Sequence, residues 1–96
     1  MNPYTINLDG SCLQLTLVGE LTIEHAQALA EKLKNTLRPE NTLAIDATQL
    51  TRLDAAALQV LLASAQVATD TLLLAPSKPW SDAFARYASP DPFRIA

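Results

Sequence analysis

The spacing of apolar residues at the start of this chain is the feature that most constrains its fold. Over residues 4–8 and 13–17, apolar and polar side chains alternate with a period of two, which is typical of strands with one buried face. Asp9-Gly10 lies between the two runs and is a favoured hairpin turn. The chain therefore begins with two antiparallel strands, and the rest of it must cover one face of a sheet.

The following residues alternate between helix and strand patterns. Apolar residues spaced by three and four predict a first helix, which Thr22 caps and which ends before Pro39. After it come a short strand at 42–46, a helix at 54–69, a buried strand at 71–75, a helix with Trp80, Phe84 and Tyr87 on one face, a turn at 89–92 and an edge strand at 93–95. Right-handed crossovers between parallel strands should collect the helices against the sheet. We expect one α/β domain over residues 1–96, with a mixed sheet of four to five strands in the order ββαβαβα(β).

Composition narrows the class of protein. With 96 residues, of which 49% are hydrophobic, the chain can build one modest core. A net charge of −3 disfavours nucleic acid and anionic membranes as partners, because both attract a positive field. Cys12 is the single cysteine, which suits a reducing compartment, and neither a secretory signal nor an apolar run of roughly 18 to 20 residues is found. We expect a cytoplasmic protein without membrane insertion.

The helix predicted at 54–69 has an unusual surface. Asp54 stands at its N-cap, and Leu58, Leu61, Leu62 and Ala65 form its expected core face. The opposite arc holds small apolar side chains and no charge, namely Ala56, Val60, Ala63 and Val67 with Gln59 and Gln66 at the border. Such a surface indicates contact with a partner, although scattered surface alanines and valines are also common without one. Both interpretations stay open on this feature alone.

The run "LAIDATQLTRLDAAALQVLLA", from Leu43 to Ala63, resembles the STAS domain of the anti-sigma factor antagonist family. Asp46 matches the Asp that ends a strand in that family, Asp54 the Asp that opens its Asp-Ser-Ser-Gly-Leu-like helix start, and Leu58 the Leu of that motif. The run "VGELT" at 18–22 is similar to the family's turn between the second strand and the first helix. The resemblance implies a STAS-like fold over nearly the whole chain.

The sequence departs from the family at the position that a kinase phosphorylates. The resemblance places the phosphorylated serine at Ala56, and Ala55 and Ala57 replace the neighbouring serine and glycine. Alanine cannot carry the phosphate that would repel a partner, so we expect binding without this switch. Thr48 and Thr51, in the predicted loop, and Ser64 could accept a phosphate instead, but such hydroxyls usually bond to the backbone.

These observations predict a non-catalytic protein-interaction module. Its expected contact surface is the N-terminus of the second helix and the preceding loop, with the residues Thr51, Arg52, Asp54, Ala56, Gln59, Val60 and Ala63. The resemblance implies three classes of partner: an anti-sigma factor or histidine-kinase-like ATPase, a chemotaxis or other signalling protein, or the ATPase of a phospholipid ABC transporter. A homodimer through the stripe 56, 60, 63 and 67 is an alternative, and so is a nucleotide or lipid bound between the third helix and the sheet near Trp80.

An enzyme, a cofactor and a metal site are not expected. His25 is the single histidine, and no second histidine or cysteine cluster accompanies it. Asp46 and Asp54 are eight residues apart, and we interpret them as a turn-stabilising side chain and an N-cap rather than as an acid/base pair. The two glycines, Gly10 and Gly19, cannot form a phosphate-binding loop.

Overall fold

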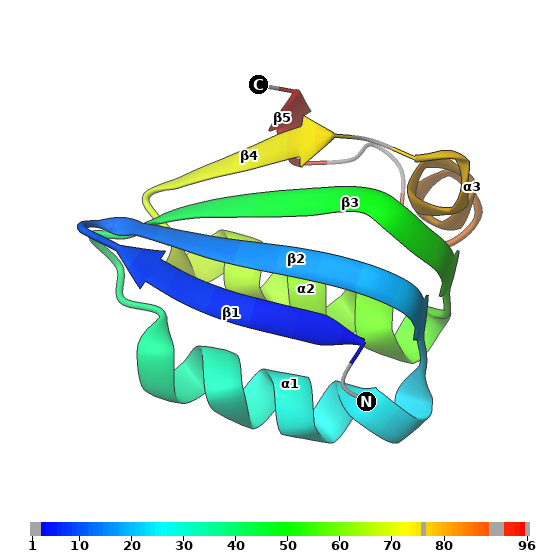
Figure 1. Ribbon diagram of the computed structural model, residues 1–96, viewed down its shortest axis with the longest axis horizontal. Helices are drawn as coiled ribbons and strands as arrows, with labels where there is room; N and C mark the ends of the chain where they lie inside the picture. The colour runs from blue at the N-terminus through cyan, green and yellow to red at the C-terminus, as the bar shows by residue number, and fades with distance from the viewer. Residues whose placement is uncertain (1–2, 76, 89–91, 96) are drawn as a thin grey trace.

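The computed structural model describes residues 3–75, 77–88 and 92–95. Its elements are β1 (Tyr4–Asp9), β2 (Cys12–Leu21), α1 (Ile23–Thr36), β3 (Thr42–Leu53), α2 (Ala55–Val67), β4 (Asp70–Ala75), α3 (Lys78–Tyr87) and β5 (Arg94–Ile95). The five strands form one sheet in the order β1-β2-β3-β4-β5, in which β1 is antiparallel to β2 and the other neighbours are parallel (Figure 1). The predicted order ββαβαβα(β) is confirmed.

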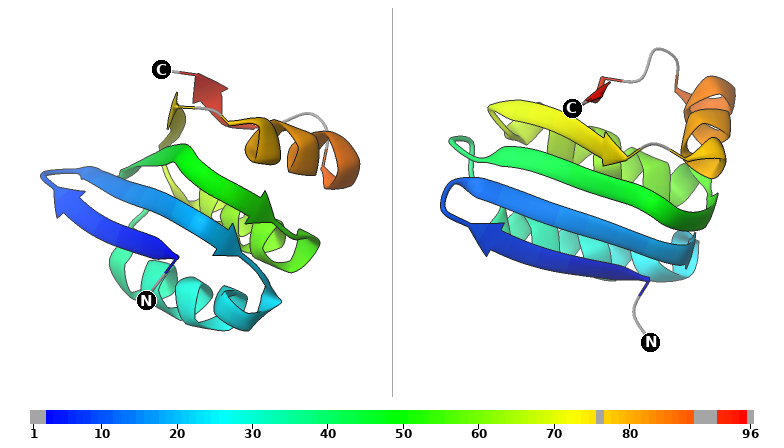
Figure 2. Two further views of the ribbon diagram at one scale, coloured as in Figure 1. Left: turned by 45° about the vertical axis from the view of Figure 1, so that its right-hand side comes forward. Right: turned by 45° about the horizontal axis from the view of Figure 1, so that its top comes forward.

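The helices are not distributed evenly around the sheet. α1 and α2 lie side by side across one face, whereas α3 lies beside the C-terminal end of β3 and also contacts α2 (Figure 2). α2 is therefore the middle helix, with α1 on one side and α3 on the other. One groove lies between α1 and α2, and another lies between the end of β3 and α3.

The N-terminal hairpin forms as its sequence predicts. β1 pairs with β2 in continuous register from Tyr4↔Leu17 to Asp9↔Cys12. Gly10 in the turn has a φ of 60°, in the left-handed region where a side chain would be strained. The apolar positions of the alternation are buried at Tyr4 and along residues 13–17, whereas Leu8 near the turn is 50% exposed.

β3 is much longer than predicted. The expected strand at 42–46 continues to Leu53, so Asp46, Thr48 and Thr51 lie within a strand rather than at its end or in a loop. The extension is possible because β2 also continues to Leu21 and supplies backbone partners as far as Leu21↔Leu53. β4 ends opposite Asp46, so the second half of β3 pairs with β2 alone among the described strands.

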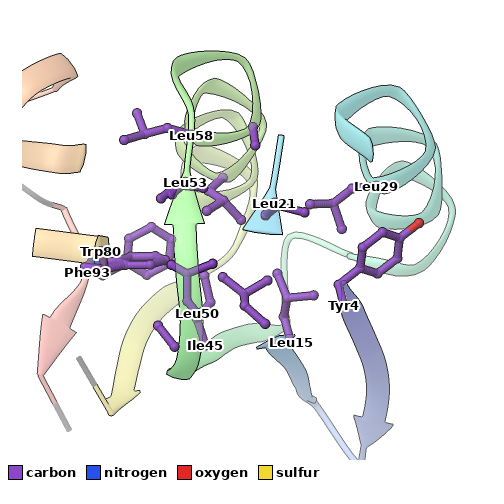
Figure 3. Packing of buried hydrophobic residues seen from close by; sticks show 14 of the residues in the cluster. Tyr4, Leu15, Leu21, Leu29, Ile45, Leu50, Leu53, Leu58, Trp80 and Phe93 are labelled. Carbon is purple, nitrogen blue, oxygen red and sulfur yellow. The ribbon is translucent and has the colours of Figure 1, made fainter. Parts of the chain in front are cut away.

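The core lies between the sheet and the helices. It is built from fully buried leucines of β2 and β3 and from Leu29 of α1 and Leu58 and Leu61 of α2 (Figure 3). Of the predicted core face of α2, Leu58 and Leu61 are fully buried, while Leu62 and Ala65 are half-buried and pack against the core. Ala57 and Ser64, which were not predicted, are buried as well. The buried face is turned toward Ser64 because α1 covers that side of α2.

An aromatic cluster fixes α3 and the end of the chain. Ser77 caps α3, Pro79 lies in its first turn, and Trp80 is fully buried. The Trp80 ring lies 4.7 Å from Phe84 and 5.4 Å from Phe93, measured between ring centroids. Tyr87, the predicted third member of this apolar stripe, is 44% exposed instead. The predicted turn at 89–92 falls mostly outside the described residues.

Candidate protein-binding site

Asp54 joins the starts of two helices. Its Oδ1 accepts a hydrogen bond from the Ala57 backbone N–H at 2.9 Å, and its Oδ2 accepts one from the Ile23 N–H at 2.7 Å. Ala57 lies in the first turn of α2 and Ile23 is the first residue of α1, so one carboxylate satisfies a free N–H of each helix. The predicted N-cap role is confirmed for α2. The bond to α1 spans 31 residues, so no local sequence pattern predicts it.

Asp46 has a local role in the middle of the sheet. It accepts hydrogen bonds from the Thr48 hydroxyl at 2.5 Å and from the Thr48 N–H at 3.0 Å. These two bonds lower the pKa of the Asp46 carboxyl, and the bond from the hydroxyl has the larger effect. The slight burial of Asp46 acts in the opposite direction and raises its pKa. Asp46 pairs with Thr16 and Ala75 in the sheet, whereas Asp54 follows the end of β3, so the two carboxylates do not form one site.

The predicted contact residues line two different grooves. The β3–α3 groove, of about 390 Å³, lies between the end of β3 and α3, and its lining residues are Thr51, Arg52, Leu53, Asp54, Lys78, Pro79, Asp82, Ala83, Arg86 and Tyr87. The α1–α2 groove, of about 420 Å³, is lined by Ala30, Leu33, Lys34, Leu37, Gln59, Val60, Ala63, Ser64 and Val67. The first groove contains many charged groups and the second is mainly apolar. Ala56 is half-buried in the first turn of α2 and lines neither groove.

The structure also places the hydroxyls that could replace the phosphorylated serine. Ser64 is 7% exposed and donates a hydrogen bond to the Val60 carbonyl at 2.9 Å. The Thr48 hydroxyl is bonded to Asp46, while Thr51 is exposed near the N-terminus of α2. Thr48 and Thr51 are therefore both exposed, whereas Ser64 is buried.

Two other side chains named in the sequence have local structural contacts. The Nδ1 atom of His25 lies 3.4 Å from the Thr22 backbone nitrogen, so this histidine helps to cap α1. Trp80 is fully buried against Phe84 and Phe93 and lines neither groove, which gives no support to a ligand pocket at its ring.

The described residues contain neither a cluster of metal ligands nor a membrane-spanning helix. No three His, Cys, Asp or Glu side chains lie together as a metal site requires. No helix in this part of the chain is long and apolar enough to cross a membrane.

Comparison with solved structures shows which proteins share this fold. Residues of this chain superpose on the unphosphorylated form of the anti-sigma factor antagonist SpoIIAA with a TM-score of 0.72 and 16% identity, covering 97% of this chain and 86% of that one. An anti-sigma factor antagonist from Mycobacterium paratuberculosis gives 0.76 and 16%, covering 96% and 82%. A Shewanella loihica protein described as having a SpoIIAA-like fold gives 0.62 and 20%, covering 97% and 83%. At these identities the likeness concerns the fold.

Comparison of the sequence gives the family. No curated protein matches the chain. A family model described as "Mlab, STAS domain" matches residues 4–91, a range that includes every residue lining the two grooves. The resemblance seen in the run from Leu43 to Ala63 is thereby confirmed over most of the chain, and this protein belongs to the STAS domain family, in the group that the Mlab model describes.

Proposed function

We propose that this STAS domain is a non-catalytic cytoplasmic module that binds a partner protein at the N-terminal end of α2. The contact begins at Thr51 and Arg52 on β3, includes Asp54 and Ala56, and continues along α2 through Gln59, Val60 and Ala63. The fold shared with SpoIIAA and a second anti-sigma factor antagonist supports a role in protein binding.

The observation that carries the proposal is the surface of α2. The helix has no charged side chain from Ala55 to Val67, yet Gln59, Ala63 and Val67 are exposed. A solvated helix face normally carries charges, whereas the centre of a protein interface is depleted of them. Exposed Thr51 and Arg52 lie next to the start of this helix and extend the surface across the end of β3.

The triple alanine at the start of α2 favours a permanent partner. Release by phosphorylation within the first turn of α2 requires a hydroxyl there, and Ala55, Ala56 and Ala57 offer none; the exposed Thr51 precedes this turn, on β3. A constitutive subunit needs no such release. Together with the Mlab description of the matching family model, this favours the ATPase of a phospholipid ABC transporter over an anti-sigma factor or a chemotaxis protein.

The test is affinity capture from the native cytoplasm with the wild-type protein and its Ala56→Arg variant as baits, read by mass spectrometry. Arginine in the first turn of α2 should block close approach, so the partner should be lost with the variant. Ala28→Arg is the matched control, because Ala28 is exposed on α1 and the change is the same. Ala56 is half-buried, so thermal melting must show that the variant folds, and Thr51→Arg at an exposed position provides an independent test.

Each result has a definite meaning. A protein captured by wild type and Ala28→Arg, but lost with Ala56→Arg and Thr51→Arg, supports the proposal and identifies the partner. Capture that survives both arginine variants contradicts it.

Binding of a small apolar ligand is the second candidate function, and the presence of the α1–α2 groove favours it. A volume of about 420 Å³ falls within the range of small-molecule sites, and the lining is mostly alanine, leucine and valine. A bound ligand should raise the melting temperature with its concentration. Dodecanoate and dodecyl maltoside are suitable probes, and Ala63→Arg should remove the shift if this groove is the site.

A further inference from the structure

More cationic than anionic side chains line the β3–α3 groove, although the whole chain has a net charge of −3. Three cations and two carboxylates line it: Arg52, Lys78 and Arg86 against Asp54 and Asp82. What a partner would encounter depends on which of these groups already have partners within the chain.

Both carboxylates of the groove are engaged. The two oxygens of Asp54 accept the N–H groups of Ala57 and Ile23, at 2.9 and 2.7 Å. Asp82 accepts a hydrogen bond from the Lys78 ammonium at 2.8 Å, which joins neighbouring turns of α3. The negative charge of both carboxylates is therefore partly offset by donors of the chain itself.

The two arginines keep most of their capacity to donate. Arg52 has an ion pair with Glu20, but the two atoms are 3.7 Å apart and the arginine side chain is 65% exposed, so this pair is weak. Arg86 forms no ion pair with any carboxylate of the described residues, and its guanidinium lies 6.0 Å from the centroid of the Tyr87 ring. Each guanidinium has five N–H donors in a planar fork that fits a carboxylate.

The two arginines line the groove that includes the N-cap of α2. Arg52 is two residues before the N-cap Asp54, and the first turn of a helix carries partial positive charge. Arg86 faces the same groove from α3, next to the 44% exposed ring of Tyr87. Arginine and tyrosine beside each other are also the residues most enriched in the energetically important parts of interfaces.

We infer that the β3–α3 groove recognises an acidic side chain, aspartate or glutamate, of the partner protein through Arg52 and Arg86. This inference rests on the proposed function, since it names the chemistry of the partner at one side of that interface. It assigns to α3 a part in partner selection that the sequence motif around Asp54 does not include.

The experiment measures binding of the purified partner, obtained by the capture described above, to wild type and to Arg86→Glu. Arg86→Glu should weaken binding roughly tenfold or more, because a charge-assisted contact becomes a repulsion. Arg52→Glu should act in the same direction. Arg38→Glu is the matched control, since Arg38 is exposed and precedes β3 at the opposite end of this strand, and it should change affinity less than about twofold.

A charge reversal in the partner makes the test specific. Replacing the partner's contacting Asp or Glu by lysine should weaken binding to wild type and restore binding to Arg86→Glu. Increasing salt from 50 to 500 mM should weaken binding to wild type more than binding to Arg86→Gln.

The outcomes separate this inference from the proposed function. If Ala56→Arg abolishes binding but Arg86→Glu and Arg52→Glu leave it unchanged, the partner docks on α2 and the acidic contact is wrong. Equal losses with Arg86→Glu and Arg38→Glu indicate a general charge effect and also overturn it. If capture survives both Ala56→Arg and Thr51→Arg, the proposed function fails and this inference fails with it.

Discussion

The two halves of β3 serve different purposes. In the first half, Leu43 and Ile45 are fully buried between β2 and β4, which pair with this segment on both sides. In the second half, β4 has ended, β2 is the neighbouring strand, and Thr51 and Arg52 are exposed at the β3–α3 groove. The first half is thus buried from Leu43 to Ile45, whereas the second half contributes both core residues and the exposed Thr51 and Arg52 of the proposed binding surface. Substitutions of buried residues in the first half and of exposed residues in the second half should therefore separate stability from binding.

The largest expected effect on stability is in the first half. Ile45→Ala should lower the free energy of unfolding by about 2–5 kcal/mol, because it removes buried methyl groups and leaves a cavity. Urea unfolding followed by circular dichroism measures this loss. Thr51→Ala, in the second half, should change the same free energy by less than about 0.5 kcal/mol because its side chain is exposed. Similar losses for the two variants would contradict the distinction between the halves.

An intermediate effect is expected at Asp54, directly after the second half. Asp54→Ala removes the caps of both helices and should cost about 1–3 kcal/mol in urea unfolding. Asp54→Asn should cost less, because its amide oxygen can still accept one N–H. If the alanine variant is as stable as wild type, the shared cap contributes nothing to folding.

The smallest expected effect is at Asp46, where the two halves meet. Hydrogen bonds from Thr48 lower the pKa of Asp46 in the folded state, so the ionised form is favoured by folding. This stabilisation is present above the ordinary carboxyl pKa of about 4 and is lost as the pH falls through the lower folded value. Thr48→Val removes the hydroxyl bond and should raise the pKa of Asp46, as measured by NMR titration of its carboxyl carbon. An unchanged pKa would show that the hydroxyl does not bond to Asp46 in solution.

Much of the fold could be predicted because the relevant signals are local. The period-two runs around Asp9-Gly10 predict the hairpin, and Thr22 and Asp54 stand at the starts of their helices as predicted. The second half of β3 could not be recognised, because its buried residues Ala47, Leu50 and Leu53 are spaced by three. This spacing accompanies two register shifts against β2, which interrupt the alternation of a regular strand.

The candidate site was predicted less completely than the fold. Thr51, Arg52 and Asp54 line the β3–α3 groove together, but Gln59, Val60 and Ala63 line the α1–α2 groove. Helical periodicity gives the face of α2 but not the position of its neighbours, α1 and α3. Arg86 and Tyr87 were not identified as site residues because tertiary packing alone brings α3 next to the end of β3.

The carboxylate of Asp54 has a consequence for the kinetics of association. Since it holds the first turns of α1 and α2 to one point, the end of the domain that we propose for docking is already formed in the free protein. A rigid surface loses little conformational entropy on binding and requires no ordering step before the encounter becomes productive. Removing the two hydrogen bonds of Asp54 should therefore slow complex formation, even where every contact made in the final complex is unchanged.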